Sequence, residues 1–507
     1  MLAPDYLDHA PDRLILLWQQ AEDDILRDVA RRIGKMGALT PTANWQLWRY
    51  QQTEAVRKDV VKLLARYTGK SEAEIRRLMK EAATAALEAE DEIYYHYGKE
   101  PTPFEESAPL QNLLNAGYRQ TAGSFSNLTA TTANTVSGAF EQALDRAWLQ
   151  VSSGAFDYKT AVKRTVDGLA DSMPYVTYPS GHRDTLEVAC RRAVLTGVNQ
   201  TGAKLQEARM DEMGASFVEV TAHGGARPSH AVWQGRRYHR GGAVDYLGQH
   251  YEDFESATGY GTGAGLCGWN CRHTFFVVFP ELGSPPAWTQ ESLEALNAQD
   301  IEHDGRLYTR YEISQMQRAR ERAVRKWKRR YLAEDAAGAD TTASAVKLRQ
   351  ARQSLADFTR ATGGRVDSAR TSVHGFGRSE ASRASYAARK QERFNAANTE
   401  LQQMREAGTI KAKGRLIESP SAPNEINFAS DHVLQRWAER GMGPMDAERI
   451  IRSSKVAMSQ RNGTQTCYYS ELGFVAIGQD GNVSSIGPLD EGGKKLMEVV
   501  KKHGIPH

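Results

Sequence analysis

The fold of the central part of the chain depends on residues 222–279, which read AHGGARPSHAVWQGRRYHRGGAVDYLGQHYEDFESATGYGTGAGLCGWNCRHTFFVVF. This stretch holds five histidines, together with Cys267 and Cys271, which are two of only four cysteines in 507 residues. Imidazole and thiolate groups at short spacing are the ligands of tetrahedral zinc. The many glycines predict turns and irregular backbone between short elements.

The candidate metal ligands are spaced as Cys267-x-x-x-Cys271-x-His273, with His230 or His223 upstream as the fourth ligand. Zinc ribbons and knuckles usually have two residues between paired cysteines, whereas this chain has three. The alternative is a glycine-rich loop without metal, in which the cysteines pack as small buried apolar residues. A catalytic zinc is less favoured than a structural one, because no acidic general base stands at a recognisable spacing.

The remainder of the chain predicts a mainly α protein with a small α+β core and a separate C-terminal α+β domain that has a small antiparallel sheet. Apolar residues recur at helical spacing in 11–35 and 43–67, and Ser71-Glu72-Ala73-Glu74 predicts a capping box for another helix that ends near Tyr95. The expected divisions are a helical body (1–213), a Gly-rich His/Cys α+β core (214–285), a basic and polar helical region (286–410), a linker (411–424) and the C-terminal domain (425–507).

Two short strands are predicted on either side of the Gly-rich segment, at Phe217–Val220 and Thr274–Phe279. The helical region that follows contains the strongly basic segment 311–330. An exposed stripe of cations there would bind DNA phosphates or an acidic protein in a salt-dependent way, although a charge run on a helix is more often a solvated face. The candidate contact residues are Arg318, Arg322, Arg325, Lys326, Arg329 and Arg330.

Three segments carry a family resemblance: HGGARPSHAVWQGRRY (223–238), GYGTGAGLCGWNCRHTFFVVFPELG (259–283) and YEISQMQRARERAVRKWKRR (311–330). They resemble the phage minor capsid protein 2 family, which is similar to the phage Mu F-like head-morphogenesis proteins. The resemblance covers about residues 1–335. It implies a virion component that associates with the portal and capsid proteins, takes part in head assembly or DNA packaging, and is made in the host bacterial cytoplasm.

The C-terminal domain is expected to contain two helices, at 429–441 and 445–454, followed by three antiparallel strands at 464–470, 473–477 and 483–486. This order, together with the pattern His432-x-x-x-Arg436-x-x-x-Arg440-Gly, resembles the barnase/EndoU/colicin/RelE-like nucleases, which occur as C-terminal toxin modules of Mu F-like proteins. The resemblance implies His432 as acid or base and Arg436 or Arg440 as phosphate ligands, with host RNA as substrate. Metal-free RNA cleavage also needs further cationic and hydroxyl groups, for which the candidates are Arg461, Thr464 and Tyr468. A solvated His/Arg face is the alternative.

Composition limits the remaining functional classes. The net charge of +3 excludes a uniformly polyanion-binding chain, and the longest apolar run, Phe275–Phe279, is too short to cross a bilayer. The acidic N-terminal segment does not resemble a signal peptide. A cytoplasmic nucleic-acid-binding protein without a virion role is the alternative function; it accounts for the basic helix but not for the Gly-rich His/Cys segment.

Overall fold

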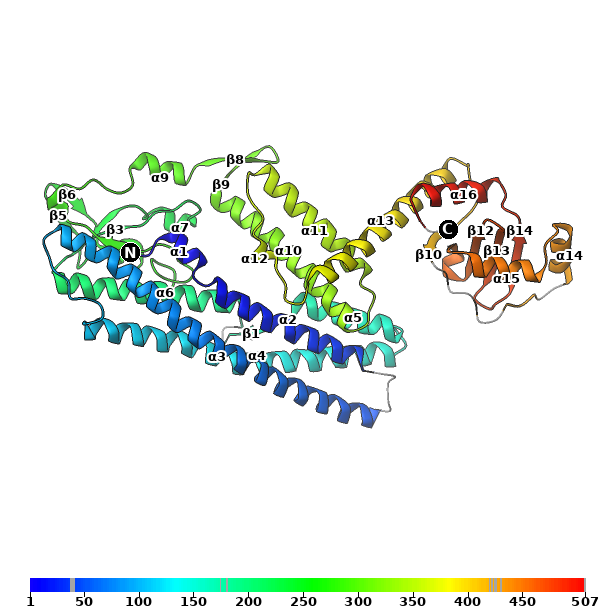
Figure 1. Ribbon diagram of the computed structural model, residues 1–507, viewed down its shortest axis with the longest axis horizontal. Coiled ribbons are helices and arrows are strands. Elements are labelled where there is room, and N and C mark those ends of the chain that lie inside the picture. The colour runs from blue at the N-terminus through cyan, green and yellow to red at the C-terminus, as the bar shows by residue number, and fades with distance from the viewer. Residues whose placement is uncertain are drawn as a thin grey trace. The chain divides into compact units, whose positions relative to one another are not determined.

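A computed structural model describes residues 1–36, 42–173, 175–178, 181–418, 420, 423, 426–428 and 431–505. The chain forms two compact units, Met1–Arg378 and Ser379–His507 (Figure 1). The predicted fold class is confirmed, because the first unit is mainly helical around a small α+β core and the second is an α+β unit with one antiparallel sheet.

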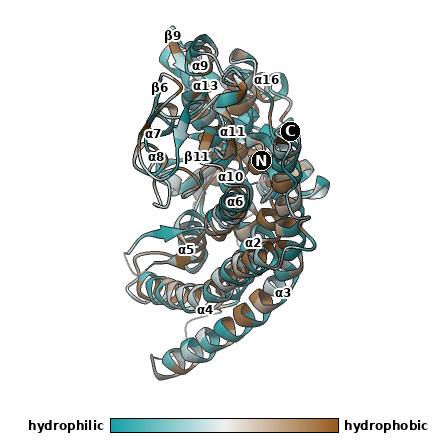
Figure 2. Cartoon of the chain, turned by 90° about the vertical axis from the view of Figure 1, so that its left-hand side faces the viewer, coloured by the Kyte–Doolittle hydropathy of each residue, from teal (hydrophilic) through white to brown (hydrophobic). Residues whose placement is uncertain are grey.

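Helices of four to 55 residues make up most of the first unit (Figure 1). They are α1 (Pro4–His9), α2 (Asp12–Gly34), α3 (Thr42–His96), α4 (Ala108–Ser152), α5 (Tyr158–Ser172), α6 (Leu186–Met213), α10 (Arg310–Ala336), α11 (Thr342–Ala361) and α12 (Ser368–Thr371). Apolar and polar positions alternate along α3, as expected for an amphipathic helix (Figure 2). The main core lies where α2 to α6 pack together, around buried side chains such as Trp18 and Phe125.

The structure corrects the prediction of one helix at 43–67 and another from the Ser71 capping box to about Tyr95, because α3 runs without a break from Thr42 to His96. Ser71, which was expected to cap the second helix, is fully buried. Its hydroxyl donates to the Tyr67 carbonyl at 2.7 Å and accepts from the Trp18 indole nitrogen at 2.9 Å. Ser71 therefore satisfies the only polar atom of a buried tryptophan, a tertiary role that local sequence cannot show.

The helices α4 and α6 approach each other closely through two reciprocal glycine–threonine contacts. A Cβ atom on Gly117 would lie 2.1 Å from the Thr201 hydroxyl, and one on Gly197 would lie 2.2 Å from the Thr121 hydroxyl. Real Cβ atoms do not tolerate such distances, so glycine at both positions sets the separation of the two helices.

Ion pairs fasten the basic helix α10 to the bundle. Arg329 pairs with the buried carboxylates of Glu22 and Asp23, with N–O distances of 2.6 Å to each. Arg325 pairs with Glu187, and Arg330 pairs with the carboxylates of α5. The expected exposed stripe is therefore corrected: four of the six candidate contact residues, Arg325, Lys326, Arg329 and Arg330, pair with carboxylates of α2, α5 and α6.

The α+β core contains a three-stranded antiparallel sheet of order β4-β3-β7, which consists of β3 (Phe217–Val220), β4 (Arg237–His239) and β7 (Phe275–Val277). The first predicted strand has the expected bounds, while the second is shorter than expected. Smaller elements surround the sheet: β1 (Val176–Thr177), β2 (Arg183–Asp184), α7 (Pro228–Ala231), β5 (Val244–Tyr246), β6 (Gln249–Tyr251), α8 (Phe254–Thr258), the 3-10 turn Pro280–Leu282, α9 (Gln290–Leu296), β8 (Gln299–His303) and β9 (Arg306–Thr309).

The second unit is a five-stranded antiparallel sheet of order β10-β11-β12-β13-β14 with helices on both faces. Its elements are α13 (Arg378–Glu406), β10 (Arg415–Glu418), α14 (Asp431–Glu439), α15 (Pro444–Ser453), β11 (Val456–Gln460), a 3-10 turn (Arg461–Gly463), β12 (Gln465–Ser470), β13 (Gly473–Gly478), β14 (Val483–Gly487) and α16 (Glu491–Lys502). Alternate residues of the strands contact α13 and α16 on one face and α14 and α15 on the other.

Two strands of this sheet were not expected. Residues 415–418 lie in the predicted linker, yet they form β10, which pairs with β11 and buries Leu416. β11 follows α15 directly, and its residues Val456, Ala457 and Met458 are all buried. A strand with helices on both faces loses the alternation of polar and apolar residues by which a half-exposed strand is recognised.

We expect Arg329→Ala to destabilise the first unit by about 3–5 kcal/mol, because it leaves the buried Glu22 and Asp23 without their cation. Urea unfolding of the full-length chain, followed by tryptophan fluorescence, measures the change. Arg322→Ala is the matched control, since Arg322 is exposed on the same helix, and it should change stability by less than about 0.5 kcal/mol. Equal effects of the two substitutions would contradict the role assigned to the ion pairs.

Candidate metal centre and cationic pocket

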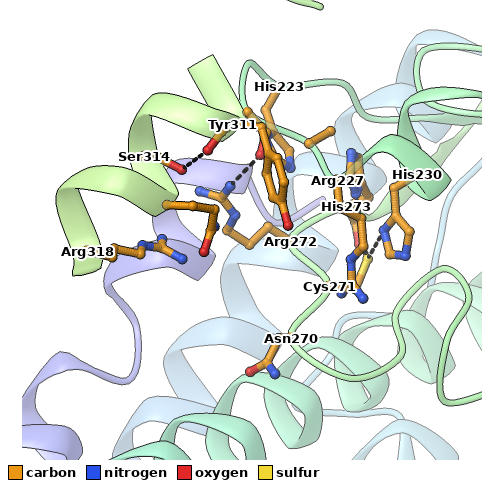
Figure 3. A pocket seen from close by; sticks show the side chains of 13 residues that line it. His223, Arg227, His230, Asn270, Cys271, Arg272, His273, Tyr311, Ser314 and Arg318 are labelled. Carbon is orange, nitrogen blue, oxygen red and sulfur yellow. Dashed lines mark hydrogen bonds between the residues drawn. The ribbon is translucent and has the colours of Figure 1, made fainter. Parts of the chain in front are cut away.

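Three buried side chains from the Gly-rich segment meet at one point: His230, Cys271 and His273. His230 lies on the short helix α7, and the other two residues lie in the segment that precedes β7. One ligand atom from each of the three lies within 4.8 Å of the others. Figure 3 shows this group on the side of a pocket opposite the residues contributed by α10.

The two sulfur–nitrogen separations in this group match those around tetrahedral zinc. The Cys271 Sγ atom lies 3.7 Å from Nδ1 of His230 and 3.7 Å from Nδ1 of His273. Zinc bonds of about 2.3 Å to sulfur and about 2.0–2.1 Å to nitrogen would place these atoms roughly 3.6 Å apart at a tetrahedral angle. The three residues could therefore hold a zinc ion with little rearrangement.

Both imidazole rings are held so that Nδ1 faces Cys271. Nε2 of His230 lies 3.0 Å from the Ala264 carbonyl oxygen, and Nε2 of His273 lies 3.0 Å from Oε1 of Gln234. Because those oxygens only accept hydrogen bonds, each Nε2 carries the proton and each Nδ1 has a free lone pair. Outer hydrogen bonds of this kind fix the tautomer of metal-binding histidines.

Burial keeps the imidazoles neutral, which is the form that binds metal. Burial lowers the pKa of His230 to about 4 and lowers the pKa of His273 well below its ordinary value. Burial also raises the pKa of the Cys271 thiol. Metal binding at this site would therefore displace a proton from sulfur rather than from either histidine.

Close backbone packing shapes the segment around Cys271. A Cβ atom on Gly265 would lie 1.9 Å from the Gly259 carbonyl oxygen, and one on Gly268 would lie 2.4 Å from that of Gly263. From the bundle, the buried Asn199 amide donates to the carbonyls of Cys271 and His273, at 3.0 Å each. The bundle and the glycine-rich loop together position the cysteine and histidine.

The structure places Cys267 outside the predicted ligand set. Its thiol donates to the carbonyl oxygen of His273, with a sulfur–oxygen distance of 3.6 Å, so it acts as a small buried packing residue. His223, the alternative fourth ligand, stacks on the His273 ring at a centroid distance of 4.3 Å without joining the group. Its Nε2 atom is buried without a hydrogen-bond partner among the described residues.

The group borders a pocket of about 230 Å³ that is lined by cations. Arg227 and Arg272 flank the ligands in sequence, and Arg318 reaches in from α10 (Figure 3). The other lining residues are His223, Gly225, Ala226, Asn270, Tyr311, Ser314 and Gln315, so no carboxylate is among the described lining residues. Only Arg318 of the predicted basic contact residues lies here; Arg322 is exposed elsewhere on the helix, and Lys326 pairs with Asp171.

Sequence reasoning did not identify Gln234 and Asn199, which orient the ligands, or Arg227 and Arg272, which line the pocket. The two arginines stand within three residues of a predicted ligand, and that proximity was the available signal. Asn199 gave no such signal, because it lies on a different helix and is identified only by its complete burial.

The described members of the predicted nuclease set contact different elements of the second unit. The side chains of His432 and Arg436 lie outside the described residues. Arg440 donates to the Ile486 carbonyl oxygen at 2.7 Å, and Tyr468 is buried in the core beneath α14 and α15. Arg461 and Thr464 share one exposed turn, where the Thr464 hydroxyl donates to the Arg461 carbonyl. The described residues alone do not form a catalytic cluster.

A comparison with protein families identifies the family to which most of the first unit corresponds. Residues 2–360 match the family model described as phage minor capsid protein 2. The chain belongs to the phage minor capsid protein 2 family. No curated protein and no solved structure matches it.

As a phage minor capsid protein, the chain is a structural component of the virion and associates with other phage head proteins. The family match confirms the resemblance seen in the three motif segments. It favours the virion role over that of a cytoplasmic nucleic-acid-binding protein. Among the described helices of this minor capsid protein, none combines the length and the apolar character needed to cross a membrane.

The geometry predicts that the purified full-length protein binds one zinc ion per chain. We expect His230→Ala and Cys271→Ser to abolish stoichiometric binding, because each removes one of three ligands, whereas Cys267→Ser should retain it. Elemental analysis after exhaustive dialysis measures the metal content. Loss of zinc in Cys267→Ser, or an absence of zinc from the parent chain, would contradict this assignment.

Proposed function

We propose that this minor capsid protein docks onto the portal during head assembly through the end of the first unit where α3 begins and α4 ends. The apolar surface at this end carries the proposal. Leu47 and Tyr50 on α3 are 59% and 64% exposed, and Leu149 on α4 is 61% exposed. Large apolar side chains grouped on a surface favour a protein partner.

An aromatic cluster supports this surface. The Trp45 ring stacks with those of Trp48 and Trp148, at centroid distances of 5.4 and 6.1 Å. Beside it, Arg49 bridges to Asp145 and Glu141 of α4 and holds the two helices together. Tryptophan and arginine next to exposed apolar residues form the kind of rigid surface on which binding energy concentrates in protein interfaces.

The length of α3 places this surface far from the Gly-rich core. At a rise of 1.5 Å per residue, the 55-residue α3 extends roughly 80 Å away from the Gly-rich core. The proposed docking end is therefore remote from the metal centre, so the two can be varied independently. Synthesis in the host bacterial cytoplasm, before head assembly, accords with this role.

We propose that zinc at His230, Cys271 and His273 stabilises the Gly-rich core in the assembled head. The core has few regular elements of its own, so a metal that ties α7 to the segment before β7 would compensate for its short strands. The role proposed for zinc here is structural.

A contact of α10 with packaged DNA would rest on Arg322 and Arg318, because the other predicted contact residues already bind carboxylates.

Docking through the aromatic end predicts that Leu47→Asp combined with Leu149→Asp prevents incorporation into phage heads, because charge is introduced where an apolar partner surface would pack. Quantitative mass spectrometry of purified particles, produced with the variant in place of the parent chain, measures incorporation. We expect at least a tenfold reduction.

The control for that experiment is Tyr95→Asp. Tyr95 lies near the other end of the same helix and is 55% exposed, so the same kind of substitution, an exposed apolar side chain to aspartate, is made at a different location. Normal incorporation of the double variant, or equal loss with the control, would contradict docking at this end.

A ribonuclease in the second unit is the second candidate function. It is supported by the position of residues 379–507, which form a separate unit beyond the family match, with apolar cores on both faces of their own sheet. His432 would then act as acid or base, with Arg436, Arg440 and Arg461 as candidate phosphate ligands.

The ribonuclease hypothesis predicts that the full-length chain degrades RNA in the presence of a chelator, because none of the proposed catalytic groups needs a metal. His432→Ala should abolish the activity, while Cys271→Ser in the first unit should leave it unchanged. Gel analysis of total RNA provides the measurement. Intact RNA with the parent chain, or equal activity in His432→Ala, would refute the hypothesis.

A further inference from the structure

The metal centre has three protein ligands, and the cationic pocket lies beside it. We propose that the fourth coordination position of the metal and the guanidinium groups of Arg227, Arg272 and Arg318 together bind one phosphate-type oxyanion. This inference rests on the zinc proposed at His230, Cys271 and His273. It adds a ligand site that a purely structural zinc does not require.

The coordination count is the first support. Zinc sites with a purely structural role are usually closed by four protein ligands, whereas a site with three keeps the fourth position for a water molecule or an exogenous ligand, even where the metal also stabilises the fold. Among the described residues, the group consists of His230, Cys271 and His273, and the thiol of Cys267 is directed to a carbonyl oxygen instead. The pocket is lined by the same three ligands, so the fourth position faces it.

The charge of the pocket is the second support. Arg227 uses one nitrogen to donate to the Trp269 carbonyl, and Arg272 shares the carboxylate of Asp8 with Arg370. Among the described residues, the carboxylate that acts on Arg318 is Asp8, which already pairs with Arg272 and Arg370. Burial, and after it the nearby Arg370, lowers the pKa of Arg318. A divalent metal would add to this excess of positive charge, which an oxyanion with two negative charges would balance.

The available hydrogen-bond donors are the third support. Guanidinium groups present several N–H donors in a planar fork that fits phosphate oxygens. His223 lines the same pocket, but its Nδ1 donates to the Gly224 carbonyl, so Nε2 of the neutral ring is an acceptor and the donors here are the guanidinium groups. Arginines on opposite walls would therefore contact different oxygens of one tetrahedral anion, which a planar carboxylate could not satisfy equally well.

The volume limits the ligand. At about 230 Å³, the pocket is smaller than the 300–1,000 Å³ typical of sites for whole small molecules. It fits a single phosphate group, either free or at the end of a chain. A terminal phosphate of a nucleic acid and inorganic phosphate share this chemistry, while the side of a duplex does not fit into such a pocket.

The test loads the metal-free full-length protein with cobalt, whose visible spectrum reports thiolate ligation and coordination number, and then adds inorganic phosphate. We expect a thiolate charge-transfer band from cobalt binding and a change in the d–d bands upon addition of phosphate. Calorimetry on the zinc-loaded protein then gives the phosphate affinity. Arg318→Gln should weaken that affinity at least tenfold without loss of metal.

Arg322→Gln is the matched control, because it removes an exposed cation from the same helix outside the pocket, and it should leave phosphate affinity unchanged. Titration with a 5′-phosphorylated and an unphosphorylated oligonucleotide distinguishes the two sources of the anion. Binding of the phosphorylated form alone identifies a nucleic-acid end, and binding of inorganic phosphate only identifies the free ion; either supports the site.

Failure of this inference can be separated from failure of the zinc proposal. A cobalt spectrum with a thiolate band that phosphate does not change, together with no heat of phosphate binding, would overturn the oxyanion site and leave the metal in place. Equal phosphate affinity with and without metal would also overturn a shared site. An absence of cobalt binding would refute the zinc proposal and this inference together.

Discussion

The buried side chain of Asn199 joins the helical bundle to the Gly-rich core. Its amide donates to the carbonyls of both Cys271 and His273, so one residue of α6 determines where the cysteine and histidine lie relative to the bundle. Gln206, two turns further along α6, donates to the Phe275 carbonyl at the start of β7. Unpaired amides and carbonyls are costly to bury, so these hydrogen bonds constrain the loop to a single position. The candidate metal centre and the pocket depend on that constraint.

Much of the fold could be predicted from local patterns. Helical periodicity predicted α2 and two segments of α3. Strand patterns predicted β3, β12, β13 and β14, with small shifts at the ends of the strands. The errors have a common physical cause. Ser71 resembles a helix cap but serves the indole of a distant tryptophan, and β11 is apolar on both faces because helices cover both. In each case a tertiary contact determined the structure, and a local pattern does not contain that contact.

The candidate site was predictable in composition but not in detail. Three of the four proposed ligands, His230, Cys271 and His273, do converge, because they lie in one segment whose glycines permit close backbone contacts. Cys267 has a left-handed backbone, with a φ of 58°, and directs its sulfur to a carbonyl oxygen. For the basic helix α10, the sequence showed the positive charge but not the carboxylates that pair with it. These carboxylates lie on α2, α5 and α6, far away in sequence.

These features describe a phage minor capsid protein whose first unit combines a long helical body with a small core organised around one cluster of nitrogen and sulfur ligands. The central claim is that this cluster is a three-ligand zinc centre. X-ray absorption at the zinc edge of the full-length protein tests it most directly. The account predicts one sulfur at about 2.3 Å and two imidazole nitrogens at about 2.0–2.1 Å, completed by a light atom that no cysteine supplies. Two sulfurs in the shell, or zinc without any sulfur, would contradict it.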